Sequence, residues 1–321
     1  MAVLNMNDQM TALEIVKRAN APDPYKIIEL MGLTNEMLLD VPAHEANNGI
    51  RNVALQRSIK PMGEHRIYNQ GVGKVATQTK IVEDRIAMMG EYSDVDARML
   101  EHSGNAKAAR HSEAVAIIKG MGLTQAETLI YGDGSRPEEF DGLMTRYNSL
   151  SNKYVRNAGG TGNNLTSIYL CAVGPDLFHL IYPKGSTSVG VNREDRGLLD
   201  VPDPKDPKKM YPVYREYFTA DYGITIKAPE AVTRIVNIPA TMSGDDLIDL
   251  ILDARHRMPT GAATYVMYSN LDILIKLDKT ARDRSNVIYT KEDPWGRAVT
   301  MVRDLRCRRM DVILNTEAAV A

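Results

Sequence analysis

The sequence predicts an α+β fold, with helices and strands concentrated in different stretches of the chain. Residues 105–131 carry the longest helical pattern and are rich in alanine. Residues 167–237 are mostly strand-like, and residues 243–257 and 270–279 return to helical periodicity. A chain of 321 residues has room for roughly two domains and can bury a substantial core.

The first 45 residues predict an arm of short helices. Thr11-Ala-Leu-Glu14 is a capping box that opens a helix to about Ala19. Asp23-Pro24 places an N-cap before a proline at the first helical position, which begins a second helix towards Leu39. The second helix has more apolar residues than so short a helix can bury against itself. We therefore expect the arm to lie on another surface.

Residues 49–89 predict a long two-stranded hairpin. Polar and apolar residues alternate along it, interrupted by Pro61-Met-Gly63 and Gly71-Val-Gly73. The segment is thinly hydrophobic and rich in Arg, Lys, Gln and Asn. Because isolated hairpins are only marginally stable in water, we expect this one to find its partner on another subunit.

Residues 105–131 predict one long helix. Ser103 or Asn105 supplies its N-cap and Gly132 ends it. At 1.5 Å per residue, such a helix of roughly 26 residues would be about 39 Å long. Gly120 and Gly122 each disfavour it by about 1 kcal/mol relative to alanine, and residues 124–127 resemble a new capping box. One helix, straight or bent near Gly120, is favoured over two.

The rest of the chain predicts strands followed by helices. Gly174-Pro-Asp176 is expected to join strands 168–173 and 177–182 as a hairpin, and four prolines in 202–212 predict a stiff surface loop. Helices are expected from Ser243 to about Arg257 and from Asn270 to about Lys279. Further strands are expected at residues 223–227, 232–238, 265–268, 298–304 and 306–314.

Composition excludes several classes of function. Lys plus Arg (39) nearly balances Asp plus Glu (41), so no global field attracts nucleic acid or anionic lipid. The N-terminal residues lack the features of a secretory signal, and no stretch approaches the roughly 18 to 20 apolar residues of a membrane span. Cys171 and Cys307 lie in apolar or strand-like runs and are expected to be buried free thiols. These features predict a soluble protein made in the cytoplasm.

Patterns associated with catalysis, cofactors and metals are incomplete. Gly71-Val-Gly73 and Gly159-Gly-Thr-Gly162 fit turns better than a dinucleotide site, since Ala76 stands where a third glycine would be. The sequence contains neither a Walker motif nor a Gly-x-Ser-x-Gly elbow. None of the histidines has metal-ligand spacing; they are His44, His65, His102, His111, His179 and His256. We therefore predict no catalytic, cofactor-binding or metal-ligating residues, and no cofactor.

Two charged clusters have structural explanations. Asp245, Asp246, Asp249 and Asp253 suit the exposed face and N-terminus of a helix better than a metal site. The densest basic cluster consists of Arg303, Arg306, Arg308 and Arg309. For this cluster, ion pairs between subunits are favoured over contact with DNA.

Short segments in consistent order along nearly the whole chain carry a family resemblance. They include Tyr68-Asn-Gln-Gly-Val72, Glu91-Tyr-Ser-Asp-Val-Asp96, Glu127-Thr-Leu-Ile-Tyr-Gly132, Tyr182-Pro-Lys-Gly185, Arg234-Ile-Val-Asn-Ile238 and the closing run 303–317. The chain thereby resembles the major capsid proteins of tailed bacteriophages, of the short-tailed (podovirus) type, which have the Hong Kong 97-like fold.

The resemblance implies a division of the chain. Residues 1–45 would be the N-terminal arm, 46–90 the extended loop (a β-hairpin), and 91–166 the peripheral domain with the spine helix 105–131. A β-rich segment, 167–240, would precede the axial-domain helices and closing strands, 241–321. The strand 264–270 and its helices follow the hairpin-like segment 167–182, which suggests a permuted order of elements.

The resemblance also implies a non-enzymatic function. The chain would be a major capsid protein that self-assembles, as hexamers and pentamers, into the icosahedral shell enclosing double-stranded DNA. Its partners would be other copies, a scaffolding protein, a portal protein and, in some members, a decoration protein, with non-specific DNA contact and no membrane. It would be located in the virion after synthesis in the host bacterial cytoplasm. The alternatives are an encapsulin-like nanocompartment shell and, less favoured, a soluble α/β enzyme.

Overall fold

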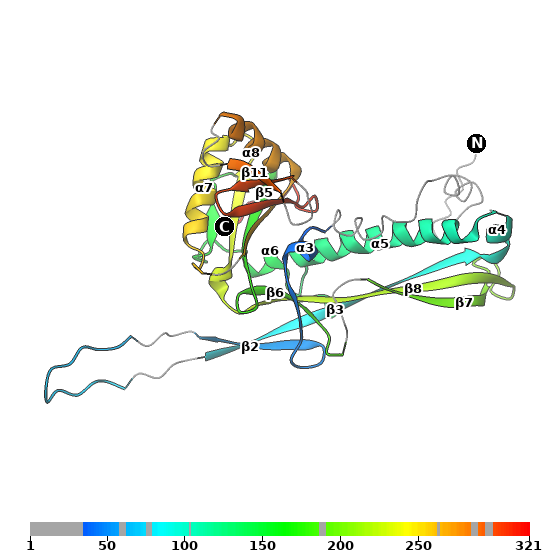
Figure 1. Ribbon diagram of the computed structural model, residues 1–321, viewed down its shortest axis with the longest axis horizontal. Helices are drawn as coiled ribbons and strands as arrows, with labels where there is room; N and C mark the ends of the chain where they lie inside the picture. Colours follow the sequence, from blue (N-terminus) through cyan, green and yellow to red (C-terminus); the bar gives the residue numbers. More distant parts are fainter. Residues whose placement is uncertain are drawn as a thin grey trace.

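The structure is a computed structural model that describes residues 35–57, 62–74, 79–102, 104–185, 191–261, 264–283, 288–292 and 298–321. The molecule is elongated (Figure 1). Helix α5 (Ala106–Tyr131) and the strands β3 (Thr79–Asp96) and β8 (Met210–Ile226) run along its length. A head of strands and helices stands at the C-terminal end of α5, and a hairpin projects beneath it.

The predicted helices of the N-terminal arm lie largely outside the described residues. The described chain begins at Asn35, and α3 (Met37–Asp40) is the described end of the second predicted helix. Met37 is fully buried, and the Asp40 carboxylate pairs with Arg308 Nε at 2.6 Å. This contact fastens the end of the arm to one of the last strands of the head.

Hydrogen-bonded strands connect the head to the elongated body. Their order is β11-β12-β13-β10-β5-β6-β8-β3-β2, while β1 pairs with β6, β7 with β8, and β9 with both β4 and β5. The remaining strands are β1 (Ala43–Glu45), β2 (Arg51–Arg57), β4 (Val155–Asn157), β5 (Leu165–Val173), β6 (Phe178–Tyr182), β7 (Asn192–Pro202), β9 (Val232–Pro239), β10 (Thr264–Ser269), β11 (Ile288–Glu292), β12 (Ala298–Val302) and β13 (Leu305–Arg309).

The predicted hairpin around residues 174–176 is wrong. Strands β5 and β6 share one parallel bridge, between Val173 and Phe178. Both edges of β5 are already occupied, by β9 on one side and β10 on the other. Strand β6 therefore pairs with β8 and β1 instead, and it links the head to the body.

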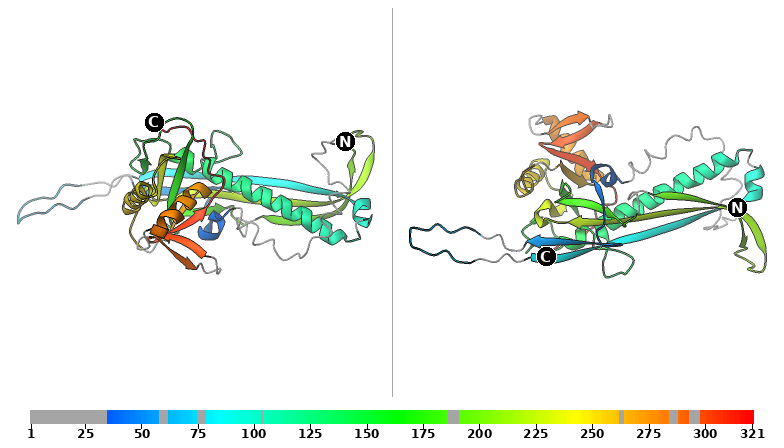
Figure 2. Two further views of the ribbon diagram at one scale, coloured as in Figure 1. Left: turned by 90° about the horizontal axis from the view of Figure 1, so that it is seen from above. Right: turned by 60° about the horizontal axis from the view of Figure 1, so that its bottom comes forward.

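The predicted long helix is confirmed as the continuous helix α5. The Asn105 side chain accepts a hydrogen bond from the Ala108 amide at 3.1 Å, and the Gly132 amide bonds to the Thr128 carbonyl at the other end. The Thr124 hydroxyl bonds back to the Gly120 carbonyl and does not cap a new helix. Burial of Ala126 and Leu129 carries the buried face of the helix past this point. Figures 1 and 2 show α5 running along one face of the long strands.

Shorter helices flank α5 and cover the head. Helix α4 (Ala97–His102) precedes α5, and α6 (Leu143–Arg146) follows α5 and contacts it. The 3-10 turn η2 (Pro229–Ala231) joins β8 to β9 and contacts β5. In the head, Ser243 caps α7 (Gly244–His256) and Asn270 caps α8 (Leu271–Asp283), as predicted. Leu247 and Ile273 of these helices are buried.

Several predicted boundaries are corrected by the structure. Pro202 and Pro212 lie within β7 and β8, so the loop between these strands is 203–209. The predicted strand 223–227 is the end of the longer β8. The last strand ends at Arg309 and not at residue 314, because the Ile313 amide turns back to the Met310 carbonyl. Strand β11 has no predicted counterpart.

Two compositional predictions can be compared with the described residues. Cys171 and Cys307 are free and buried, as expected. Burial raises the pKa of both thiols, that of Cys307 to about 12, so neither is a reactive thiolate at neutral pH. Within the described ranges, the helices fall short of the length and hydrophobicity needed to span a membrane.

Candidate functional site

The projecting hairpin is the first candidate site. Strand β2 pairs antiparallel with residues 79–85 of β3, from Arg51 opposite Arg85 to Arg57 opposite Thr79. The predicted two-stranded excursion is confirmed in this part. The inner part of β3, residues 86–96, pairs instead with β8 of the same chain.

The two faces of this hairpin differ in exposure. Asn52, Ala54 and Asp84 are buried on the side that faces the body. On the opposite side, Leu55 and Ile81 lie directly across from each other and are 67% and 63% exposed. Directly opposed apolar side chains normally stabilise a sheet by packing together away from water. Here the pair remains open to solvent on the described chain.

Large apolar side chains continue towards the tip of the hairpin. The tip, residues 62–74, carries Met62, Ile67 and Tyr68, and Tyr68 is 99% exposed. Residues 56–80 contain five Lys or Arg and one Glu, a formal charge of +4 with His neutral. Apolar and basic groups together suit a protein surface that is neutral or acidic.

Polar contacts hold the root of the hairpin. Asn52 Nδ2 donates to Thr225 Oγ1 at 3.0 Å, and Gln56 Nε2 donates to the Ile226 carbonyl at 2.8 Å. Arg146 Nη1 lies 2.7 Å from the buried Asp84 carboxylate. These contacts fix the direction in which the hairpin leaves the body.

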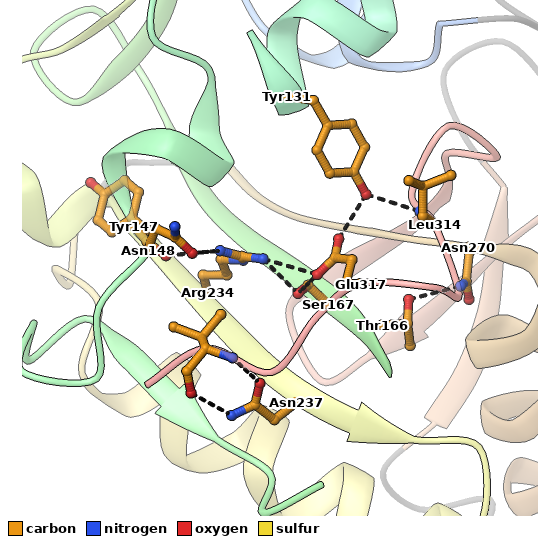
Figure 3. A network of polar contacts seen from close by, with 11 residues as sticks. Tyr131, Tyr147, Asn148, Thr166, Ser167, Arg234, Asn237, Asn270, Leu314 and Glu317 are labelled. Atoms are coloured by element: carbon orange, nitrogen blue, oxygen red, sulfur yellow. Dashed lines mark hydrogen bonds and ion pairs between the residues drawn. The ribbon is translucent and has the colours of Figure 1, made fainter. Parts of the chain in front are cut away.

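A buried ionic network lies where the head meets the C-terminal end of α5 (Figure 3). Arg234 of β9 is fully buried, and its Nη2 donates to Glu317 Oε2 at 2.9 Å and to Ser167 Oγ at 3.0 Å. The Glu317 carboxylate also accepts from Ser167 Oγ at 2.5 Å and from Tyr131 Oη at 2.7 Å. Burial and the nearby Glu317 charge raise the pKa of Tyr131, so its hydroxyl stays protonated as a donor.

Sequence reasoning missed this network. An arginine inside the apolar strand 232–238 indicates a buried charge that needs a partner. That partner, Glu317, lies 83 residues further along the chain. Nothing in the spacing identifies it, because the fold alone brings the two residues together.

The basic cluster near the end of the chain makes ion pairs within its own chain. Arg308 and Arg306 both approach Asp40, at 2.6 and 3.8 Å, and Arg309 Nη2 pairs with Asp311 at 2.6 Å. The ion pairs predicted between subunits stay a prediction. The acidic face of helix α7 is likewise engaged locally, since Asp253 pairs with Arg257 at 3.2 Å.

The candidate metal and nucleotide residues remain apart. Among the described residues, His, Cys, Asp and Glu form no group of three or more arranged to hold a metal ion. Gly159 and Gly162 have positive φ angles and lie in the turn that leads to β5. The rings of His44 and His179 contact each other edge to face, with their centroids 5.0 Å apart. Burial, with Lys227 and His44 nearby, lowers the pKa of His179 to about 4.

Comparison with known proteins gives the fold and the family. The family model of major capsid protein GP7 matches residues 20–321. A chain from the near-atomic structure of bacteriophage Epsilon15 is 26% identical with a TM-score of 0.72, over 100% of this chain and 99% of that chain. A chain of the bacteriophage JBD30 capsid is 10% identical with a TM-score of 0.50, over 94% of this chain and 99% of that chain. Among curated proteins, none matches the chain.

The shape, the projecting hairpin and these likenesses define the class as a tailed-bacteriophage capsid protein with the Hong Kong 97-like fold. The chain belongs to the major capsid protein GP7 family. It is a major capsid protein that self-assembles into the virion shell, which confirms the fold and function predicted from the sequence. An encapsulin from Synechococcus elongatus is 11% identical with a TM-score of 0.41, over 63% of this chain and 86% of that chain. That likeness is too low to support the nanocompartment alternative.

Proposed function

We propose that copies of this chain form the hexamers and pentamers of an icosahedral shell around double-stranded DNA. In this shell, the hairpin of each copy lies on a neighbouring copy. One observation carries this proposal. Leu55 and Ile81 form an apolar pair that no described segment of their own chain covers. Exposed apolar surface beside basic residues is typical of a protein interface.

The hairpin and the surface that receives it are different patches. A contact between different patches generates a ring when the rotation closes, and a closed shell requires such rings. The formal charge of +4 on residues 56–80 favours an acceptor that is neutral or acidic. The polar contacts at the root fix the direction of the hairpin before it meets the neighbour, which lowers the entropy lost on binding.

We further propose the domain division expected from the sequence. Residues 1–45 form the arm, 46–90 the extended loop, 91–166 the peripheral domain, 167–240 a β-rich segment and 241–321 the axial domain. Helix α5 supports the peripheral assignment and helices α7 and α8 the axial one. Because β8 pairs with β3 along eleven residues, 86–96, we add β7 and β8 to the peripheral domain. The permuted order of elements stays a prediction.

We infer that the remaining partners are a scaffolding protein, a portal protein and a decoration protein, with packaged DNA contacted non-specifically. We also infer synthesis in the host cytoplasm, and no catalytic, cofactor-binding or metal site. The incomplete motifs and the buried thiols support a purely structural protein.

A shortened hairpin tests the proposal. Arg57 and Thr79 are directly opposite, so residues 58–78 can be replaced by Asn-Gly, which closes a two-residue hairpin turn. We expect a folded subunit with a near-normal circular dichroism spectrum that forms no shells by negative-stain microscopy, with its scaffolding protein present. The paired change Leu55→Thr and Ile81→Thr, which keeps the hairpin length, should weaken assembly in the same direction.

The matched control is Leu198→Thr, which alters an exposed apolar residue on β7. It should assemble normally. Normal shells from the shortened hairpin would contradict the proposed role of the hairpin. The capsid function itself would be contradicted only if the unaltered chain also failed to form shells.

A further inference from the structure

The last residues of the sequence are held through their backbone, as a bound peptide is. The Glu317 amide donates to the Leu165 carbonyl at 2.9 Å, and the Leu165 amide donates to the Glu317 carbonyl at 3.3 Å. Two residues on, the Ala319 amide donates to the Gly162 carbonyl at 3.0 Å. The bridge between Glu317 and Leu165 is an isolated antiparallel one, and it uses the same main-chain hydrogen bonds that supply affinity when a peptide adds to the edge of a sheet. We call residues Glu317–Ala321 the C-terminal segment.

The side chain of Asn237 continues this pairing where no strand is available. Its Oδ1 accepts from the Val320 amide at 2.8 Å, and its Nδ2 donates to the Val320 carbonyl at 3.0 Å (Figure 3). Asn237 is 4% exposed and has a φ of 60°, in the left-handed region. Its Nδ2 also donates to Asn157 Oδ1 at 2.9 Å. A buried asparagine in this conformation, with both amide atoms aimed at one residue's backbone, is a built feature of the fold.

The Glu317 side chain provides selectivity. Its carboxylate receives hydrogen bonds from Tyr131, Ser167 and Arg234, of which Ser167 and Arg234 are fully buried. Hydrogen bonds to a buried ionised group are among the strongest in proteins, and an uncharged replacement would leave the Arg234 charge without its partner. Ala318 and Ala319 are exposed, whereas Val320 packs against the main core. The site therefore recognises an acidic residue followed, three positions later, by valine.

We propose that the surface around β5 and β9 is a binding site for an extended Glu-x-x-Val peptide; its residues are Gly162, Leu165, Arg234 and Asn237. The ligand of this site is the C-terminal segment of this chain. The segment stays bound even when the peptide bond that joins it to the rest of the chain is cut. It follows that the same segment from a second copy can take the place of the resident one. Leu314 and Thr316, which precede the segment, are exposed, so a protease can reach the backbone there.

Cleavage after folding tests this inference on the full chain. A protease recognition sequence is inserted between Leu314 and Asn315 and cut once the protein has folded. We expect the cut protein to retain the peptide 315–321, and to exchange it for a fluorescent synthetic copy with saturable binding and a Kd below about 1 mM. The uncut protein should take up almost none, since a tethered ligand acts at a high effective concentration.

Two variant peptides measure specificity. The peptide with Glu317→Gln should bind at least about tenfold more weakly, because it removes the charge opposite Arg234. The peptide with Ala318→Ser, altered at an exposed position, should bind as the original does. The proposal is overturned if cutting unfolds the protein, if the labelled peptide fails to bind saturably, or if the Glu317→Gln change leaves the affinity unaltered.

Discussion

At the residue scale, the pair of Arg234 and Glu317 should dominate stability. Arg234→Met leaves the buried Glu317 carboxylate without its cation, and we expect the free energy of unfolding to fall by about 3–5 kcal/mol. Replacing both residues by Met removes both charges and should recover much of that loss. Urea unfolding of the unassembled subunit measures all three free energies. Equal losses in the single and double variants would contradict a buried, mutually dependent pair.

An exposed ion pair serves as the control for that comparison. Asp304 pairs with Arg255 at 2.5 Å, but its side chain is 48% exposed. Asp304→Asn should cost less than about 1 kcal/mol, since solvent screens such pairs.

His179 should make stability depend on pH. Its pKa in the folded protein is about 4, below the ordinary value of 6.5, because burial, Lys227 and His44 disfavour the charged imidazolium. The unfolded chain therefore binds a proton more readily, so stability is fully present above pH 6.5 and falls as the pH drops towards 4. The shift corresponds to at most about 3 kcal/mol. His179→Phe should flatten this part of the profile in urea unfolding between pH 7 and 4.5, whereas His65→Gln, at an exposed position, should not.

Local residue contacts were predictable from the sequence, and distant ones were not. Asn105, Ser243 and Asn270 cap helices that begin at the next residue, so the capping residue and its target amide lie within a few positions. The partners of Arg234 and Arg308 lie far away along the chain. These pairs form because the order of strands in the fold brings the two residues together, and that order cannot be inferred from the residue types alone.

At the element scale, Gly120 is a weak point of α5. Its position is exposed, and an added Cβ would meet no atom within 4 Å. Gly120→Ala should therefore stabilise the subunit by about 0.5–1 kcal/mol through helix propensity, measured as a rise in thermal midpoint. Gly142→Ala is the contrasting change, because its Cβ would lie 2.6 Å from the Ile130 carbonyl oxygen. That variant should be destabilised.

Elements were predicted well where the pattern is local. Helices α5, α7 and α8 follow from their caps and apolar spacing. The strand pairing around β5 was not predictable. The turn residues 174–176 suggest that β5 and β6 form a hairpin, and they carry no information about the other strands that pair with β5. Competition for the two edges of β5 decided the outcome. The candidate hairpin site was predicted from the alternation of polar and apolar residues. The continuation of β3 into the body, where it pairs with β8, was not predicted.

At the scale of the whole molecule, the free subunit and the shell should differ mainly at the tip of the hairpin. In residues 62–74, the amides of Gln70 and Gly73 have hydrogen-bond acceptors within the tip, and the side chains are exposed. We expect the amides of the tip to exchange hydrogen rapidly in the free subunit and slowly in the shell. Those of β5, whose residues are all buried, should be protected in both states. Equal exchange of the tip in the two states would contradict burial by a neighbour.

The length of β3 has a mechanical consequence. This one strand of 18 residues, about 60 Å at 3.3 Å per residue, begins in the hairpin and ends beneath α5. Any pull on the hairpin along its axis is carried by the covalent backbone into the body, where it meets the eleven residue pairs formed with β8. Because antiparallel hydrogen bonds run perpendicular to the strands, such a load shears them together and does not open them one by one. Each subunit would thus carry tension from its hairpin, along β3, across the wall of the shell.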